Sequence, residues 1–559
     1  MKVGALLIVI GLAISLTVSA FGTENSTPEF PAKSKDRFLG YIAPSYLGNF
    51  TVVQVSNNTP EANEITLARG EDGTFYMGWN DYRSVPWSSG YVHVGFSYSR
   101  DGGKTWSTNI VLGNVTDSAL HDCAGDPVII TGYGSDCYYL IMEFNASEAH
   151  GGSLKHSQLV VKKTSDYGAT WDEALIWGYD VDKPWGAFYN GDLYVAWDNV
   201  SAGTTCFSRT INGNIHSWTS PVYLPGSNYY PSIDVSEDGT IYIAVVHSSF
   251  FSYSMYVYKS TDGGNNFNYY EVGPVGSNSW ESDPRSGPIP SLSARGSDVY
   301  VVWVSKDTYS QVYLAESHDS GNTWSNEVIP TTYGSNYRYM YPSVSVAPTG
   351  VVHISYYRMD ENTKKIEVLY RTYENGVFSD EVLVDTWTNN NSFIGDYATI
   401  VADDWGNVSI GYTTENPTDN AMFATLSIPI EITDVWNSSV NGTIASGEDL
   451  VVNAKITSGS ELKNVTLYYR FENDSSYSST SMNLILGDAF NGTWTANIST
   501  VGHSGKLYFY IYADDGRGKS AVSQEYYVDV ISTPEILPAV LIALPSIVIL
   551  RKLRYPSTS

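Results

Sequence analysis

The chain has 559 residues, of which 44 are tyrosine, 48 are glycine and only 16% are charged. This composition is typical of β structure and excludes a helical bundle or a disordered chain. The 59 acidic and 31 basic residues give a net charge of −28, which repels phosphate backbones and excludes nucleic acid as a partner.

The N-terminus has the three parts of a secretory signal. Lys2 is followed by an apolar run over residues 3–18 and by the small residues Ser19 and Ala20. The pattern predicts a signal peptide over residues 1–20 and hence export. Fourteen Asn-x-Ser/Thr sequons agree with export and indicate a glycoprotein, and six of them lie between residues 437 and 497.

A repeated motif organises residues 50–428. Its pattern is Ser-x-Asp-x-Gly-x-Thr-Trp, and the step between copies is about 50 residues, the length of a propeller blade. The Asp and the closing aromatic residue of the four good copies are Asp101 and Trp106, Asp166 and Trp171, Asp262 and Phe267, and Asp319 and Trp324.

Each repeat contains four short strands with alternating apolar residues. The first often follows a proline, as in Pro231, Pro290 and Pro342, and the second is strongly apolar, as in residues 193–197 and 299–303. Six units are complete, and the strand at residues 51–55 can complete a seventh and close the ring. The sequence therefore predicts an all-β propeller of seven blades, with six as the alternative.

The motif resembles the Asp-box (BNR repeat) of the sialidase superfamily, and the match covers about two thirds of the chain. The resemblance implies a propeller in which the boxes are structural. We expect each Asp to accept hydrogen bonds from its own turn, the Gly to take a positive φ and the aromatic ring to pack into the blade.

Two further segments follow the propeller. Residues 429–531 contain some seven short strands and predict an immunoglobulin-like sandwich, similar to fibronectin-type modules, that acts as a stalk. Residues 532–559 combine Pro534-Glu535, a 15-residue apolar stretch and a basic cluster. This tail resembles archaeal Pro-Glu-Phe sorting signals, with Ile536 in the Phe position, and predicts anchoring to the membrane at the cell surface.

The sialidase resemblance also implies that ligands bind on the face opposite the boxes, where each first strand begins. Four arginines in a strongly acidic chain fall in loops assigned to this mouth, and they favour an acidic glycan or another anion. The alternative is that each arginine only pairs with a nearby acid. The candidate ligand-binding residues are Asp81, Arg83, Asp283, Arg285, Arg338, Arg358 and Asp396.

The catalytic residues of sialidases are only partly present. Tyr397 resembles the position of the family's tyrosine nucleophile. The first arginine of the family's triad is absent from residues 63–67, and the acid/base Asp is absent from residues 84–90. The sequence therefore leaves open whether the protein is an enzyme of sialidase-like glycosidase type and argues against sialic acid hydrolysis.

Cysteine and histidine spacing predicts no zinc site. Cys123 and Cys137 flank one hairpin, whose turn at residues 132–136 places residue 145 opposite Cys123, so strand geometry argues against a disulfide between them. No cofactor is expected, although calcium near Asp122 and Asp126 is chemically reasonable for an exported acidic protein.

Three functions are compatible with these patterns. The first is a surface protein that binds glycan or a neighbouring protein at the propeller mouth. The second is a glycoside hydrolase of altered specificity. The third is a passive coat component, since a fold by itself does not establish activity.

Overall fold

The computed structural model describes residues 50–532 except 58–60, 83–91, 113–120, 151–153, 251, 283–284, 332–333, 335, 390–392, 404–406, 416–417, 427–428, 459–461, 488, 490 and 517–519. The predicted signal peptide and nearly all of the predicted tail lie outside the described residues and stay predictions. Within the described residues the fold is all-β, with one short helix, α1 (Ala146–His150). No helix among them is long and apolar enough to cross a membrane.

Seven antiparallel sheets, which we number 1 to 7, occupy the described part of residues 51–426. Sheet 1 contains β2 (Ala62–Arg69), β3 (Phe75–Asp81), β4 (His93–Ser99) and β5 (Ile110–Leu112). Sheet 2 contains β6 (Cys123–Thr131), β7 (Cys137–Phe144), β8 (Gln158–Thr164) and β9 (Asp172–Trp177). Sheet 3 contains β10 (Val181–Tyr189), β11 (Asp192–Asn199), β12 (Thr204–Ile211), β13 (Asn214–Trp218) and β14 (Val222–Tyr223).

The remaining sheets of this region have the same meander order. Sheet 4 contains β15 (Ser227–Val235), β16 (Ile241–Ser248), β17 (Tyr253–Ser260) and β18 (Asn268–Val275), and is followed by the small hairpin β19 (Glu281–Ser282) and β20 (Arg285–Ser286). Sheet 5 contains β21 (Ser291–Arg295), β22 (Asp298–Lys306), β23 (Ser310–Ser317) and β24 (Ser325–Val328). Sheet 6 contains β25 (Tyr337–Val346), β26 (Val352–Asp360), β27 (Lys365–Glu374), β28 (Val377–Phe378) and β29 (Val382–Thr388). Sheet 7 contains β30 (Thr399–Ala402), β31 (Val408–Glu415), β32 (Asp419–Leu426) and β1 (Thr51–Gln54).

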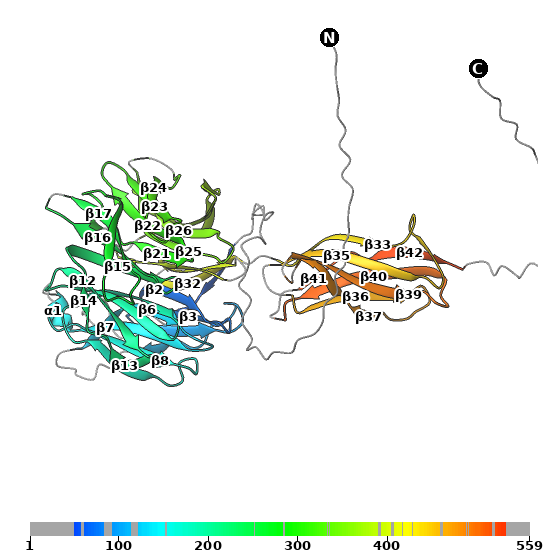
Figure 1. The fold of residues 1–559 in the computed structure, drawn as a ribbon, viewed down its shortest axis with the longest axis horizontal. Coiled ribbons are helices and arrows are strands. Elements are labelled where there is room, and N and C mark those ends of the chain that lie inside the picture. The colour runs from blue at the N-terminus through cyan, green and yellow to red at the C-terminus, as the bar shows by residue number, and fades with distance from the viewer. Residues whose placement is uncertain are drawn as a thin grey trace, which may run out of the picture. The chain divides into compact units, whose positions relative to one another are not determined.

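The first strands of consecutive sheets form the inner wall of a closed ring. β2, β6, β10, β15, β21, β25 and β30 contact one another in this order, and β30 contacts β2 again. The ring is completed by β1, which pairs with β32 in the register Thr51↔Thr425, as expected for the closing strand. Figure 1 shows the yellow β32 beside the blue β2. Because successive sheets radiate from a ring of inner strands, the fold is a β-propeller.

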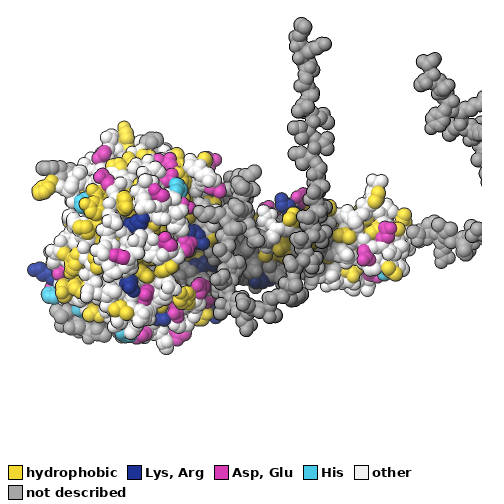
Figure 2. Space-filling view, in the orientation of Figure 1, with side chains coloured by type: hydrophobic (Ala, Val, Ile, Leu, Met, Phe, Trp, Pro, Cys, Tyr) yellow, Lys and Arg dark blue, Asp and Glu magenta, His cyan; other side chains and the backbone are white. Residues whose placement is uncertain are grey.

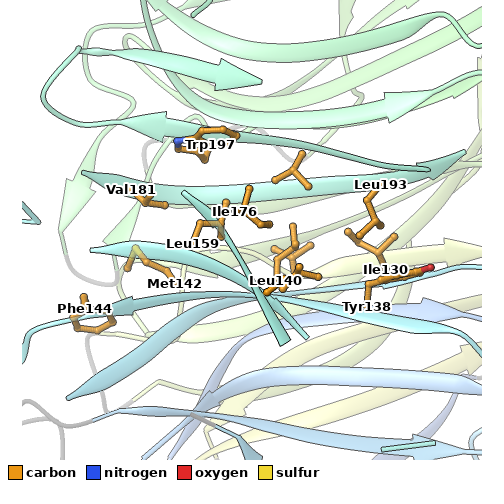
Figure 3. Close-up of a cluster of buried hydrophobic side chains, with 14 of the residues drawn as sticks. Ile130, Tyr138, Leu140, Met142, Phe144, Leu159, Ile176, Val181, Leu193 and Trp197 are labelled. Atoms are coloured by element: carbon orange, nitrogen blue, oxygen red, sulfur yellow. The ribbon is translucent and has the colours of Figure 1, made fainter. Parts of the chain in front are cut away.

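Apolar side chains fill the spaces between neighbouring sheets. Figure 3 shows one such cluster, in which Leu140 and Leu159 of sheet 2 lie near Val181, Leu193 and Trp197 of sheet 3. Burial of each side chain of this size contributes about 1.5–3 kcal/mol, so the interfaces between sheets hold the ring together. On the outer surface shown in Figure 2, acidic side chains are scattered among neutral and hydrophobic ones.

The Asp-boxes have the local geometry expected from the motif. Asp319 accepts hydrogen bonds from the Thr323 backbone N–H (2.8 Å), the Thr323 hydroxyl (2.7 Å) and the Ser317 hydroxyl (2.9 Å), and Gly321 has a φ of 74°. The corresponding residue four positions after each box Asp donates to Asp101, Asp166 and Asp262. Such donors stabilise the ionised carboxylate.

The box aromatics pack into the core of their own sheet and also reach the preceding sheet of the ring. Trp171 of sheet 2 lies 6.4 Å from Tyr139 of the same sheet and packs edge-on against Phe96 of sheet 1 at 5.0 Å. Phe267 of sheet 4 packs against Phe207 of sheet 3 at 5.3 Å, and Trp106 of sheet 1 contacts Phe423 of sheet 7. These three boxes therefore tie their sheet to the preceding one.

Residues 431–531 form a separate pair of sheets with one shared core. The first contains β33 (Glu431–Asn437), β35 (Asp449–Thr457), β39 (Asn491–Ser499) and β38 (Asn483–Gly487). The second contains β34 (Thr443–Ala445), β42 (Tyr526–Ile531), β40 (Gly505–Asp514), β36 (Asn464–Phe471), β37 (Ser478–Ser481) and β41 (Ser520–Val522). Buried residues of both sheets, such as Val452 and Phe509, belong to one apolar cluster. The region is thus a β-sandwich, and its immunoglobulin-like class stays a prediction.

The three cysteines are buried, and they form no disulfide with one another. Cys123 lies opposite Phe144, and Cys137 lies opposite Thr131. The partner of Cys123 differs by one residue from the predicted residue 145, because the register shifts between Gly125 and Val128. The two cysteines of this hairpin do not face each other.

Candidate functional site at the propeller axis

The inner strands share an irregularity that carries chemically active side chains. In five sheets the pairing of the first and second strands shifts register, and one residue at each shift has a positive φ. A bulge of this kind re-aims a side chain, and a positive φ is costly for a residue other than glycine. We call these axial positions; they are Glu64 (φ 55°), Asp126 (48°), Lys183 (42°), Tyr230 (59°) and Tyr341 (49°).

The axial positions lie at the end of the ring that is opposite the boxes. Each is near the start of a first strand, whereas each box follows a third strand. In an antiparallel meander the first and third strands run in the same direction, so their starts and ends fall on opposite faces. The axial residues therefore belong to the face that the sequence assigned to ligands.

A buried lysine is the centre of the site. The Lys183 Nζ atom lies 2.6 Å from Asp396 Oδ2, 3.0 Å from Asp126 Oδ1 and 3.8 Å from Glu64 Oε1, and only 13% of the lysine side chain is exposed. The four side chains come from sheets 1, 2, 3 and 7. Gly395 permits this approach, because a Cβ there would lie 2.6 Å from the Glu64 backbone nitrogen. The ring closure thus assembles one ion cluster from residues far apart in the sequence.

Glu64 of sheet 1 and Asp126 of sheet 2, which both lie near Lys183, have pKa values shifted in opposite directions. Burial raises the pKa of Glu64 well above its usual range, and Asp126 and Asp396 raise it against the opposing effect of Lys183. Burial would also raise the pKa of Asp126, but Lys183 and a hydrogen bond with Glu64 bring it below its usual value. The opposite shifts favour a proton on Glu64 and the charged form of Asp126.

A second row of acids supports the axial backbone. Asp182 Oδ1 accepts a hydrogen bond from the Lys183 backbone N–H at 2.9 Å, and burial raises the pKa of Asp182 to about 6. Asp198 Oδ2 accepts from the Tyr230 N–H at 2.7 Å, and burial raises its pKa well above the usual range. These carboxyl groups hold the strained axial residues in place.

Aromatic side chains line the pocket above the ion cluster. Lys183 and Asp396 share this pocket with Trp185, Tyr230, Tyr341 and Tyr397, together with Ile289 and several prolines. Trp185 meets Tyr397 edge to face at 5.5 Å. The pocket has a volume of about 20 Å³, which is room for about one water molecule. A sugar ring would therefore lie across the rim and place only a substituent inside.

Tyr397, the predicted nucleophile candidate, lines this pocket, and its catalytic role stays a prediction. Its hydroxyl donates a hydrogen bond to the Pro127 carbonyl oxygen at 3.2 Å. Burial raises the pKa of Tyr397 well above its usual range, and the nearby Glu64, Asp126 and Asp396 raise it further. Activation of a nucleophile requires the opposite shift or an adjacent base.

Two of the four predicted arginines, Arg338 and Arg358, have described side chains. Neither lines the axial pocket. Arg338 pairs with Glu361 at 2.7 Å, and Arg358 pairs with Glu367 at 2.7 Å and Glu381 at 3.0 Å. Each of these two arginines therefore pairs with nearby glutamates, as the alternative reading of the sequence expects. Arg83, Asp283 and the Arg285 side chain lie outside the described residues. Anion binding by the four arginines stays a prediction.

Asp81 and the proposed calcium ligands have other partners. Asp81 is buried and accepts from the Trp79 indole N–H at 3.2 Å. Asp122 accepts from the Ala146 N–H at 2.7 Å, whereas Asp126 binds Lys183. Among the described residues, no group of three or more His, Cys, Asp or Glu side chains is arranged to hold a metal ion.

Sequence analysis missed Lys183, Glu64 and Tyr230 as site residues. A signal was present, because the residue before the first-strand proline is axial in Asp126-Pro127, Lys183-Pro184, Tyr230-Pro231 and Tyr341-Pro342. Alignment of the repeats on this proline identifies the axial residue of these four units and does not identify Glu64, which precedes Ile65. It does not indicate which axial side chains touch.

Comparisons with known sequences assign the chain to no family. No family model matches the sequence, and no curated protein matches it. Among solved structures, the chain is similar to the α-L-arabinanase of Penicillium chrysogenum complexed with arabinobiose, with 14% identity, a TM-score of 0.39, and coverage of 68% of this chain and 98% of that one.

Two other similar structures cover more of the chain. The phage phi92 endosialidase has 10% identity and a TM-score of 0.41, over 89% of this chain and 91% of that one. A polysaccharide lyase of family PL25, an ulvan lyase, has 10% identity and a TM-score of 0.30, over 87% and 96%.

Proposed function

We propose that the protein is an exported, surface-anchored propeller that binds a neutral carbohydrate at its axial pocket without cleaving it. One observation carries the proposal: Lys183 is held by Asp126 and Asp396 beneath a rim of aromatic rings. Aromatic rings pack against the apolar faces of sugars, and a few fixed polar groups orient the hydroxyl groups.

The charge of the cluster favours an uncharged ligand. Lys183 is the single basic group among three carboxyl groups, those of Glu64, Asp126 and Asp396, so acidic groups outnumber basic ones in the cluster. An anionic sugar would meet repulsion in a poorly hydrated site, where charges interact more strongly than in water. The aromatic rim presents no positive charge to offset it.

Hydrolysis finds less support from the geometry. A glycosidase places two carboxyl groups about 5–9.5 Å apart across the scissile bond. Glu64 and Asp126 are instead hydrogen-bonded to each other, and Tyr397 is bonded to a backbone carbonyl. The hydrolase alternative is therefore an outcome of the test below.

The test uses the purified full chain on a glycan array with neutral and sialylated oligosaccharides, followed by calorimetry on each hit. We expect neutral glycans to bind, and Trp185→Ala to weaken binding about tenfold, since stacking on one ring contributes about 1–1.5 kcal/mol. Tyr269→Ala, which removes a tyrosine that is 56% exposed on β18, is the matched control. Failure of every neutral glycan to bind, binding that Trp185→Ala leaves unchanged, or release of sugar from a hit would contradict the proposal.

A further inference from the structure

The sandwich, predicted to be a stalk, has a sheet face covered with tyrosines. Along β40, Leu507, Phe509 and Ile511 are buried in the core, whereas Tyr508, Tyr510 and Tyr512 alternate with them on the other side. Because side chains alternate along a strand, these three tyrosines share the outer face. On β36 the same alternation brings Tyr468 and Arg470 to that face. We call these five residues the tyrosine face.

The tyrosine face has a built geometry. Tyr468 lies directly opposite Tyr510 in the strand pairing, and their rings stack at 5.1 Å with an interplanar angle of 9°. The pocket beside them has a volume of about 410 Å³, and its lining residues are Tyr468, Tyr510, Tyr512, Val522, Ser523 and Glu525. This volume lies within the range of small-ligand sites, about 300–1,000 Å³, and is much larger than that of the axial pocket.

Arg470, the cation of the tyrosine face, contacts aromatic rings and forms no ion pair with an acid among the described residues. The Arg470 guanidinium carbon lies 4.3 Å from the centre of the Tyr508 ring and 5.3 Å from that of Tyr477. In the part of the chain that the structure describes, Arg470 makes no ion pair, whereas the neighbouring Lys506 pairs with Asp529 at 3.1 Å. An arginine held flat on rings keeps its forked N–H donors for a carboxylate ligand.

We propose that the tyrosine face binds a polysaccharide of carboxylate-bearing sugars, in which sugar rings stack on Tyr468 and Tyr510 and a carboxylate pairs with Arg470. Stacked tyrosines offer a broad surface at a low entropic cost, because each has only two side-chain torsions. At the rim, Glu525 accepts a hydrogen bond from the Tyr477 hydroxyl, and the Ser523 hydroxyl donates to the Gln524 carbonyl oxygen, so the ring faces and Arg470 are the groups left for the sugar. In a chain of net charge −28, an arginine without an acidic partner supplies the complementary charge. This site is independent of the axial pocket.

The test is calorimetry of the full chain with polygalacturonate and with its methyl ester, which keeps the sugar ring and removes the charge. We expect Tyr510→Ala to weaken binding of both polymers about fivefold or more, since the stacked ring is lost. Arg470→Met should weaken binding of polygalacturonate by tenfold or more and leave the ester unchanged, because the lost hydrogen bonds are to a charged group. Trp436→Ala, which removes a 46% exposed aromatic residue on β33 of the other sheet, is the control.

Three results would overturn the proposal. One is that neither polymer binds. Another is that a folded Tyr510→Ala protein, with an unchanged melting temperature, binds like the wild type while Trp185→Ala does not, which would move the site to the axial pocket. The last is that sedimentation shows self-association that Tyr510→Ala abolishes, which would assign the face to a second copy of the chain.

Discussion

The two faces of the propeller differ in what is repeated from sheet to sheet: one face repeats side chains, and the other repeats only a backbone conformation. The box positions keep the same residue types from sheet to sheet, and Asp101, Asp166, Asp262 and Asp319 all accept hydrogen bonds from their own turns. The axial positions repeat only a backbone shape, since a positive φ recurs at Glu64, Asp126, Lys183, Tyr230 and Tyr341.

This difference separates scaffold from site. A repeated side chain with a repeated local partner is needed by the fold in every unit. A repeated backbone shape with a different side chain in each unit lets the ring combine an acid, a base and aromatic rings at one point. Function then depends on which side chains the site contains, and not on the fold that presents them.

The largest effect is expected for Lys183→Met. The change leaves Asp126 and Asp396 buried without their shared cation, so we expect a loss of about 3–5 kcal/mol in the free energy of unfolding at pH 7. The loss should be smaller at pH 5, where the acids can take up protons, and urea titrations at the two pH values measure it. Lys163→Met is the control, because it breaks a more exposed pair with Asp136 at 2.8 Å and should cost less than about 1 kcal/mol. Equal losses for the two variants would remove the distinction between the axis and the surface.

Asp182→Asn is expected to raise the free energy of unfolding, by less than Lys183→Met lowers it. Burial raises the pKa of this acid in the folded state to about 6, above its value of about 3.9 in the unfolded chain. The folded state therefore loses stability as the pH rises from about 4 to 6, and an asparagine removes this loss while its Oδ1 still accepts from the Lys183 N–H. We expect the variant to be about 1–2 kcal/mol more stable than the wild type at pH 7, and no more stable at pH 4. A gain that is the same at both pH values would show that the acid does not titrate in this range.

The smallest effect is expected at a single box. Asp101→Ala should lower the free energy of unfolding by about 1 kcal/mol at pH 7, because partly exposed hydrogen bonds contribute little each, and should leave ligand binding unchanged.

Hydrogen bonds lower the pKa of Asp166, Asp262 and Asp319 to about 2 in the folded state. Their contribution is therefore present above about pH 4 and is lost as the pH falls towards 2. Replacing all three by Asn should flatten the dependence of the urea midpoint on pH between 4 and 2. An unchanged slope would show that the boxes do not act through the charged form.

Sequence predicted the fold well because the signals of a propeller are local. Box turns, alternating strands and prolines each act within a few residues, so the strands of sheets 1 to 7 and the closing strand at Thr51–Gln54 follow from them. The axial site depends on contacts between sheets. Asp396 and Lys183 are 213 positions apart, and no local pattern states that they meet. The tyrosine face was missed for another reason: a strand with Tyr508, Tyr510 and Tyr512 indicates only alternation, and which side faces outward depends on the partner sheet.

The pairing of β1 with β32 has a consequence for how the domain is made. The two strands that complete sheet 7 come from the beginning and the end of the propeller sequence, so the ring cannot close until residue 426 is available. Until then β1 lacks its partner strand β32, and an unpaired edge strand invites association with other chains. Late pairing between distant segments is also slow. The N-terminal strand β1 thus closes the ring. Cleavage after Gln54 would release β1 from the rest of the propeller and would expose the edge of β32.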